Sequence, residues 1–292
     1  MNSQKLFGSV LLSVAAAIWG GTFVAVKEVV GVIHPLQLVW LRYFVALIFL
    51  IGFSLVKRER WHFRWRDAKW FALIGLTGYT VSIVMQETGT WLSSAQTGAV
   101  VTASTPTFMV LFAWLLFKEK LNRVKICALI MATLGVVMIV GVHLSGRHVL
   151  MGVGLLILAA LSWSLMSVLI KKVPDYSALQ ITIIATVIAL VCLTPFMLGS
   201  FPSLARINFA APKIWFCLLY VGAISTALAF VMWNKGLTLI DTSASGLFYL
   251  LQPIVGTLLG WWLLGEALTL GFALGSALIL SSVFISVRYA DA

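Results

Sequence analysis

The feature that most constrains this chain is a series of long stretches without a charged residue. A stretch of about 17 residues or more can cross a bilayer core roughly 30 Å thick as a helix. Clear examples are 6–26, 92–117, 126–142, 149–170, 214–234, 242–265 and 267–287. Three more are 36–56 with Arg42, 70–91 with Glu87, and 176–205, whose membrane-spanning part should end near Gly199 because of Pro202. The sequence therefore predicts ten membrane-spanning helices.

Composition excludes an ordinary soluble enzyme. Hydrophobic residues make up 61% of the chain and charged residues 10%, against about 25% charged in a soluble domain. The apolar stretches are continuous and do not alternate with period two, which excludes a closed β-barrel. We therefore expect an all-α polytopic membrane protein.

The positions of the basic residues predict its orientation. With ten helices and a cytoplasmic N-terminus, 15 Lys and Arg residues fall on the inner side and four on the outer side. Cytoplasmic loops carry an excess of Lys and Arg, so both termini should be cytoplasmic. The segment 57–69 mixes basic and aromatic residues, and we interpret it as a contact with lipid headgroups rather than with nucleic acid.

The chain also repeats itself. Trp19 and Trp163 each stand eight residues before a lysine, and Pro106 and Pro253 each stand thirteen residues before a glutamate, Glu119 or Glu266. Leu36-Gln37-Leu38 matches Leu179-Gln180-Ile181. We therefore predict two related halves, 1–146 and 147–292, of five helices each. Because five is odd, the second half should be inverted in the membrane, the architecture of many alternating-access transporters.

These residues resemble a known family. Two five-helix halves, Trp19-Gly20 in the first helix, Arg42 in the second, and Gly, Pro, Trp-Leu-Leu and Glu in order along the fourth and ninth helices are similar to the EamA-type transporters of the drug/metabolite transporter superfamily. The resemblance covers nearly the whole chain. It implies an inner-membrane permease with a central cavity lined mainly by the first, third, fourth, sixth, eighth and ninth helices, and often export of amino acids or related metabolites.

The repeated tryptophans are the first candidate site residues. Trp19 lies thirteen residues beyond Leu6 and eight before Lys27, about 20 Å and 12 Å along a helix. That depth places the ring inside the membrane core rather than in an interfacial belt, and Trp163 is placed similarly. Two interpretations stay open: plain packing, or a cavity wall that offers a stacking or cation–π surface to a substrate.

Arg42 and Glu87 are charges inside predicted membrane-spanning segments. Such charges are costly unless they pair, snorkel or face water, so both are functional candidates. We expect them to pair or to line an outer vestibule together, with Arg42 binding a substrate carboxylate and Glu87 an amine or a proton. The alternative is a snorkelling residue or a fixed ion pair that only locks helices. Ala185 and Asn234 are their counterparts in the second half.

Polar residues near two prolines form a second set. Thr102 precedes Pro106, and Tyr249 and Gln252 precede Pro253. A proline frees a helix carbonyl, and a helix broken at the midplane presents backbone dipoles to a solute; simple kinks with back-bonded hydroxyls are the alternative. The predicted cavity wall is completed by Tyr79, Gln86, Trp233 and Asn234.

The sequence shows no pattern of an enzyme. No metal-binding or phosphate-binding motif is present, so we expect neither metal nor cofactor, and energy from a gradient, with protons as a candidate coupling ion. Cys127, Cys192 and Cys217 lie in apolar stretches, and we interpret them as buried, reduced packing residues. Gly271 and Gly275 form a GxxxG motif, which leaves both a monomer and a homodimer open.

We therefore predict a secondary transporter of the inner or plasma membrane that exports small organic metabolites, such as amino acids or related amphipathic compounds. An uptake permease for similar solutes is the first alternative. A lipid flippase, a membrane enzyme and a non-transporting sensor are less favoured.

Overall fold

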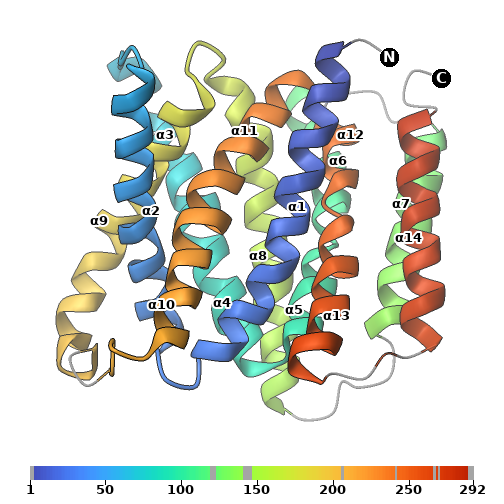
Figure 1. Ribbon diagram of the computed structural model, residues 1–292. Coiled ribbons are helices and arrows are strands. Elements are labelled where there is room, and N and C mark those ends of the chain that lie inside the picture. Colours follow the sequence, from blue (N-terminus) through green and yellow to red (C-terminus); the bar gives the residue numbers. More distant parts are fainter. Residues whose placement is uncertain are drawn as a thin grey trace.

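The computed structural model is a helical bundle, and it describes residues 3–118, 123–140, 147–204, 207–240, 242–265, 268 and 270–288 (Figure 1). Glu119 and Glu266 lie outside the described residues. The first part of the chain contains α1 (Ser3–Val29), α2 (Pro35–Lys57), η1 (Trp65–Asp67), α3 (Ala68–Ile74), η2 (Gly75–Ser82), α4 (Ile83–Leu92), α5 (Ala95–Thr102), α6 (Thr105–Phe117) and α7 (Arg123–Val140).

The second part contains α8 (Arg147–Leu169), η3 (Ile170–Lys172), α9 (Ala178–Leu204), α10 (Pro212–Leu219), η4 (Tyr220–Leu228), α11 (Ala229–Leu239), α12 (Thr242–Phe248), α13 (Leu251–Leu264) and α14 (Leu270–Arg288). In Figure 1, α1 stands near the middle of the bundle, α2 and α9 lie on one side, and α7 and α14 form a pair on the other.

Seven helices among the described residues are long and apolar enough to cross a membrane. They are Ser3–Val29, Pro35–Lys57, Trp65–Leu92, His148–Lys172, Ala178–Gly199, Pro212–Leu239 and Ser245–Leu264. The protein is therefore a multi-pass membrane protein, and the count of ten helices stays a prediction. The apolar part of α9 ends at Gly199, but its helical backbone continues through Pro202 to Leu204, because a proline removes only one helix hydrogen bond.

The repeated Leu-Gln motif is explained by two helix starts. At α2, the backbone N–H of His34 donates to Oε1 of Gln37 at 3.3 Å. At α9, the backbone N–H of Ser177 donates to Oε1 of Gln180 at 3.3 Å. Each glutamine closes a capping box, which satisfies backbone donors that the first turn of a helix leaves unpaired.

Helices of the two predicted halves approach each other at glycines, at two places with the same pattern. A methyl group added at Gly89 of α4 would lie 2.7 Å from the carbonyl oxygen of Gly152 in α8. A methyl group added at Gly236 of α11 would lie 2.6 Å from the side chain of Leu12 and 3.4 Å from the carbonyl oxygen of Gly8 in α1. Gly8 and Gly152 each stand eleven residues before the repeated tryptophan, so the two contacts correspond.

The two π-helical segments, η2 and η4, also correspond. A methyl group at Gly75 of η2 would lie 2.7 Å from Ile188 of α9, and one at Gly222 of η4 would lie 2.6 Å from Val45 of α2. In η2 and η4 a threonine hydroxyl bonds to the carbonyl five residues earlier. π-Helical turns are rare and often occur at functional sites.

The cysteines are free, but the interpretation that they are buried is wrong. Cys127 is exposed, and Cys192 and Cys217 are partly exposed. In a membrane protein the outward face of a helix is as apolar as its core, so an apolar stretch does not imply burial against protein.

Candidate functional site

A cluster of aromatic rings surrounds Trp19 near the middle of α1. Its ring centroid lies 5.2 Å from that of Trp163, 5.6 Å from Phe230, 5.1 Å from Trp233 and 5.6 Å from Tyr249. Trp19 is 6% exposed and Trp163 is 3% exposed. The repeated tryptophans thus meet edge to face inside the bundle.

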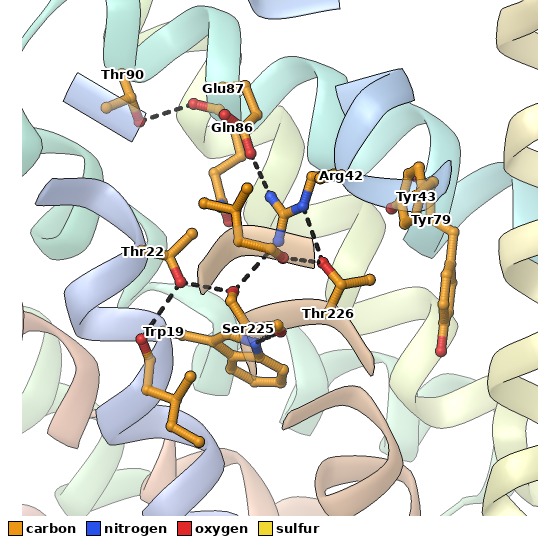
Figure 2. A network of polar contacts seen from close by, with 12 residues as sticks. Trp19, Thr22, Arg42, Tyr43, Tyr79, Gln86, Glu87, Thr90, Ser225 and Thr226 are labelled. Carbon is orange, nitrogen blue, oxygen red and sulfur yellow. Dashed lines mark hydrogen bonds and ion pairs between the residues drawn. The ribbon is translucent and has the colours of Figure 1, made fainter. Parts of the chain in front are cut away.

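A buried polar network adjoins this cluster (Figure 2). The Arg42 guanidinium pairs with the Glu87 carboxylate, and the two side chains are 1% and 0% exposed. Arg42 Nε donates to Thr226 Oγ1 at 2.9 Å, and Arg42 Nη2 donates to Ser225 Oγ at 3.3 Å. Ser225 Oγ is 2.6 Å from Thr22 Oγ1. The ion pair expected from the sequence is present, and each nitrogen of Arg42 already has a partner.

The π-helix η4 links the network to the aromatic cluster. Trp19 Nε1 donates to the backbone carbonyl oxygen of Ser225 at 2.9 Å. Thr226 Oγ1 donates to the carbonyl oxygen of Val221 at 2.6 Å. One π-helical segment thus supplies the carbonyl that accepts the indole N–H and the two hydroxyl side chains that hold Arg42. Movement of η4 would disturb the rings and the charges together.

A small cavity lies between the rings and the network. Its volume is about 10 Å³, roughly the space of one water molecule. Its wall is formed by Trp19, Thr22, Arg42, Ile83, Gln86, Trp163, Phe230 and Tyr249. A space of this volume cannot hold an organic solute, so binding of one requires the surrounding helices to separate.

Tyr249 reaches this wall from a break in a helix. The backbone turns at Ala103–Ser104 between α5 and α6, and at Tyr249–Leu250 between α12 and α13. In the first break, Ser104 Oγ donates to the Val101 carbonyl at 2.8 Å, and Thr105 Oγ1 donates to the Thr102 carbonyl at 2.6 Å. The regular helix is thus interrupted before both prolines, and at the first break back-bonded hydroxyls reach the carbonyls of Val101 and Thr102, so features of both alternatives are present.

A second buried polar cluster surrounds Asn234, the predicted counterpart of Glu87. Asn234 Nδ2 donates to the Tyr79 hydroxyl at 3.0 Å and to Thr182 Oγ1 at 2.9 Å. The Tyr43 hydroxyl donates to the carbonyl oxygen of Tyr79. The charged Glu87 thus has a neutral amide, Asn234, as its counterpart in the predicted repeat.

Several buried polar atoms have no hydrogen-bond partner among the described residues. They include Trp163 Nε1, Glu87 Oε2, Asn234 Oδ1 and Gln252 Oε1. Trp163 is the one of these four residues that lines the cavity. A buried donor without an acceptor is costly, so Trp163 Nε1 marks a position where a hydrogen-bond acceptor of a ligand is favourable.

The predicted site residues fall into two layers. The cavity wall contains Trp19, Arg42, Gln86, Trp163 and Tyr249. Behind it lie Tyr79, Glu87, Thr102, Trp233, Asn234 and Gln252, each buried. In this layer Gln252 Nε2 donates to Thr102 Oγ1 at 2.7 Å, and Trp233 Nε1 donates to Ser167 Oγ at 3.4 Å. The resemblance implies that the fourth helix lines the cavity, but none of the described lining residues comes from 95–117. Instead, α2 contributes Arg42 to the wall.

The sequence reasoning missed Thr22, Ile83 and Phe230 on the wall and Ser225 and Thr226 in the network. The adjacent hydroxyls of Ser225 and Thr226 in an otherwise apolar stretch were the one available signal. Nothing in the sequence separates Phe230 from other membrane phenylalanines. Over the described residues, no group of three or more His, Cys, Asp or Glu could hold a metal ion.

Comparisons with known proteins agree with this architecture. The model of the EamA-like transporter family matches the chain twice, over residues 6–141 and 150–288. An uncharacterized transporter of Archaeoglobus fulgidus is 27% identical, over 96% of this chain and 98% of its own length. A probable amino-acid metabolite efflux pump of Salmonella typhimurium is 27% identical, over 95% of this chain and 93% of its own length. One crystal structure superposes with a TM-score of 0.75 at 20% identity, over 97% of both chains.

Proposed function

We propose a function from the premise that the chain belongs to the EamA-like transporter family. The protein is a membrane transporter that exports small organic metabolites, such as amino acids or related amphipathic compounds. It works by alternating access. The small cavity between helices of both predicted halves carries the proposal. Its wall combines aromatic faces with donors from Arg42 and Trp163. Such a wall suits a solute with an apolar or aromatic body and an acceptor group such as a carboxylate.

Two inverted halves would give this cavity its two openings. The double match of the family model supports the division of the chain into 1–146 and 147–292. The corresponding glycine contacts support it as well. In Figure 1, α1 and α8 run in opposite directions, as an inversion requires.

The orientation proposal places both termini in the cytoplasm of a cell whose plasma or inner membrane holds the protein. The start of α1 and the end of α14 lie at the same end of the bundle (Figure 1). The distribution of Lys and Arg along the sequence favours that end as the cytoplasmic one.

The test is transport in proteoliposomes, with a panel of amino acids and aromatic metabolites, in both directions and with or without a pH gradient. We expect saturable flux of at least one solute with a carboxylate, and faster export than import. Saturable flux of no candidate would contradict the transport proposal. Faster import would favour the uptake permease, and flux unchanged by a pH gradient would remove protons as the coupling ion.

Trp163→Phe should weaken substrate binding without unfolding the protein. The phenyl ring keeps apolar contact with Trp19 and Phe230, but the indole N–H is lost. A hydrogen bond is worth about 1 kcal/mol, so KM should rise by roughly fivefold to tenfold. Trp40→Phe is the matched control: its indole N–H bonds to Thr194 Oγ1 at 3.1 Å and the residue does not line the cavity, so KM should stay unchanged. Equal effects of both changes on KM would refute the role of Trp163.

A further inference from the structure

An apolar groove opens on the outside of the bundle, away from the substrate cavity. It has a volume of about 190 Å³ and lies between α2 on one side and η4 with α11 on the other. Its lining is Phe49, Leu50, Phe53, Ala223, Ala227, Leu228 and Val231. None of these residues lines the substrate cavity. The groove lies on membrane-spanning helices, so it faces hydrocarbon.

Both walls of the groove carry a lysine at the same end. Lys57 follows Phe53 by four residues on α2, and Lys235 follows Val231 by four residues on α11. Residues four apart share a helix face, about 6 Å from each other along the axis. Both lysines are exposed. Glu59 is the acidic neighbour on the α2 side, where it pairs with Lys57 at 3.3 Å.

We propose that the groove binds one acyl chain of an anionic phospholipid, with the lipid phosphate held near Lys57 and Lys235. The depth of the groove in the membrane fits a lipid, because an acyl chain that begins at the headgroup level of these lysines runs directly along Phe53 and Phe49. The charge fits as well, because Lys57 lies in the last turn of α2 and Lys235 lies four residues before the end of α11, and basic residues near the cytoplasmic surface attract an anionic headgroup. Lipid chains that lack an anionic headgroup would gain only the apolar contact.

The groove and the substrate site share the π-helical segment η4, so a bound lipid can affect the site. Ala223 and Ala227 lie on η4, on either side of Ser225 and Thr226, the residues that hold Arg42. A chain seated in the groove therefore presses on the outer face of the helix whose inner face carries the polar network. We expect bound anionic lipid to stabilise the arrangement of the site in this structure.

Lipid binding to the purified full-length protein in detergent tests the proposal without any transport measurement. We expect dioleoyl phosphatidylglycerol to raise the thermal unfolding temperature several degrees more than dioleoyl phosphatidylcholine, and to remain bound in native mass spectrometry. The double variant K57Q/K235Q should lose at least half of that difference. The control K69Q/K118Q removes the same charge from exposed lysines that do not follow the groove, and it should keep the difference.

A second variant tests the acyl-chain part of the site. Ala223→Leu fills the groove from η4, so it should reduce the stabilisation by both lipids. Equal stabilisation of the native protein by the two lipids would overturn the proposal. An equal loss in K57Q/K235Q and K69Q/K118Q would also overturn it, since basic surface charge in general would then explain the effect.

Discussion

Replacement of Arg42 alone by Met should destabilise the protein strongly, and the added change Glu87→Met should restore most of the loss. Arg42 and Glu87 are both buried, and removal of one partner leaves an uncompensated charge in the bundle. The expected cost is about 3–5 kcal/mol for the single variant. A pair of methionines leaves no charge and fills a similar volume, so the double variant should unfold close to the native temperature. Thermal unfolding of the purified proteins in detergent measures this.

The same variants separate the two interpretations of the pair. If Arg42 contacts the substrate, the double variant is folded but loses saturable flux in proteoliposomes by more than tenfold. If the pair only locks helices together, the double variant keeps both its stability and its flux. We expect loss of flux, because Arg42 lines the cavity whereas Glu87 lies behind it. A double variant no more stable than R42M would refute the pairing argument itself.

Arg42 and Glu87 could be found from the sequence because a charge in hydrocarbon is expensive and therefore conspicuous. Trp19 and Trp163 could be found because their repeat and their depth coincide. Serine, threonine and phenylalanine are inexpensive in a membrane helix, so Ser225, Thr226 and Phe230 carried no comparable signal. Sequence patterns thus identify residues whose burial in lipid is costly. They do not identify residues of low cost that complete the cavity wall or the polar network.

The π-helical segments were also beyond sequence reasoning. Periodicity cannot separate a π-turn from an α-turn, because the hydrophobic pattern of a membrane helix is nearly uniform. In η4 the carbonyl oxygen of Ser225 accepts a hydrogen bond from the indole N–H of Trp19, which lies on a distant helix. This contact depends on tertiary packing. The membrane helices can be predicted from local composition, whereas the residues around the cavity are brought together by contacts between helices that are distant in the sequence.

The two glycine contacts lie at opposite ends of the bundle, so a bulky residue at one of them should open the transporter on one side and a bulky residue at the other should open it on the opposite side. Gly89→Leu should force α4 away from α8 at one end, and Gly236→Leu should force α11 away from α1 at the other. Alternating access requires each end to close in turn, so each variant should lower flux more than tenfold. Each should hold the transporter open on its own side.

Cysteine labelling can show the side. With Cys127, Cys192 and Cys217 changed to Ser, Gln86→Cys places one thiol on the cavity wall. A membrane-impermeant maleimide should then label the Gly89→Leu variant from the side opposite the termini, and the Gly236→Leu variant from the side of the termini. Gly154→Leu is the matched control, because an added methyl there meets nothing within 4 Å. Labelling of the Gly89→Leu and Gly236→Leu variants from the same side would contradict the proposed rocking of two inverted halves.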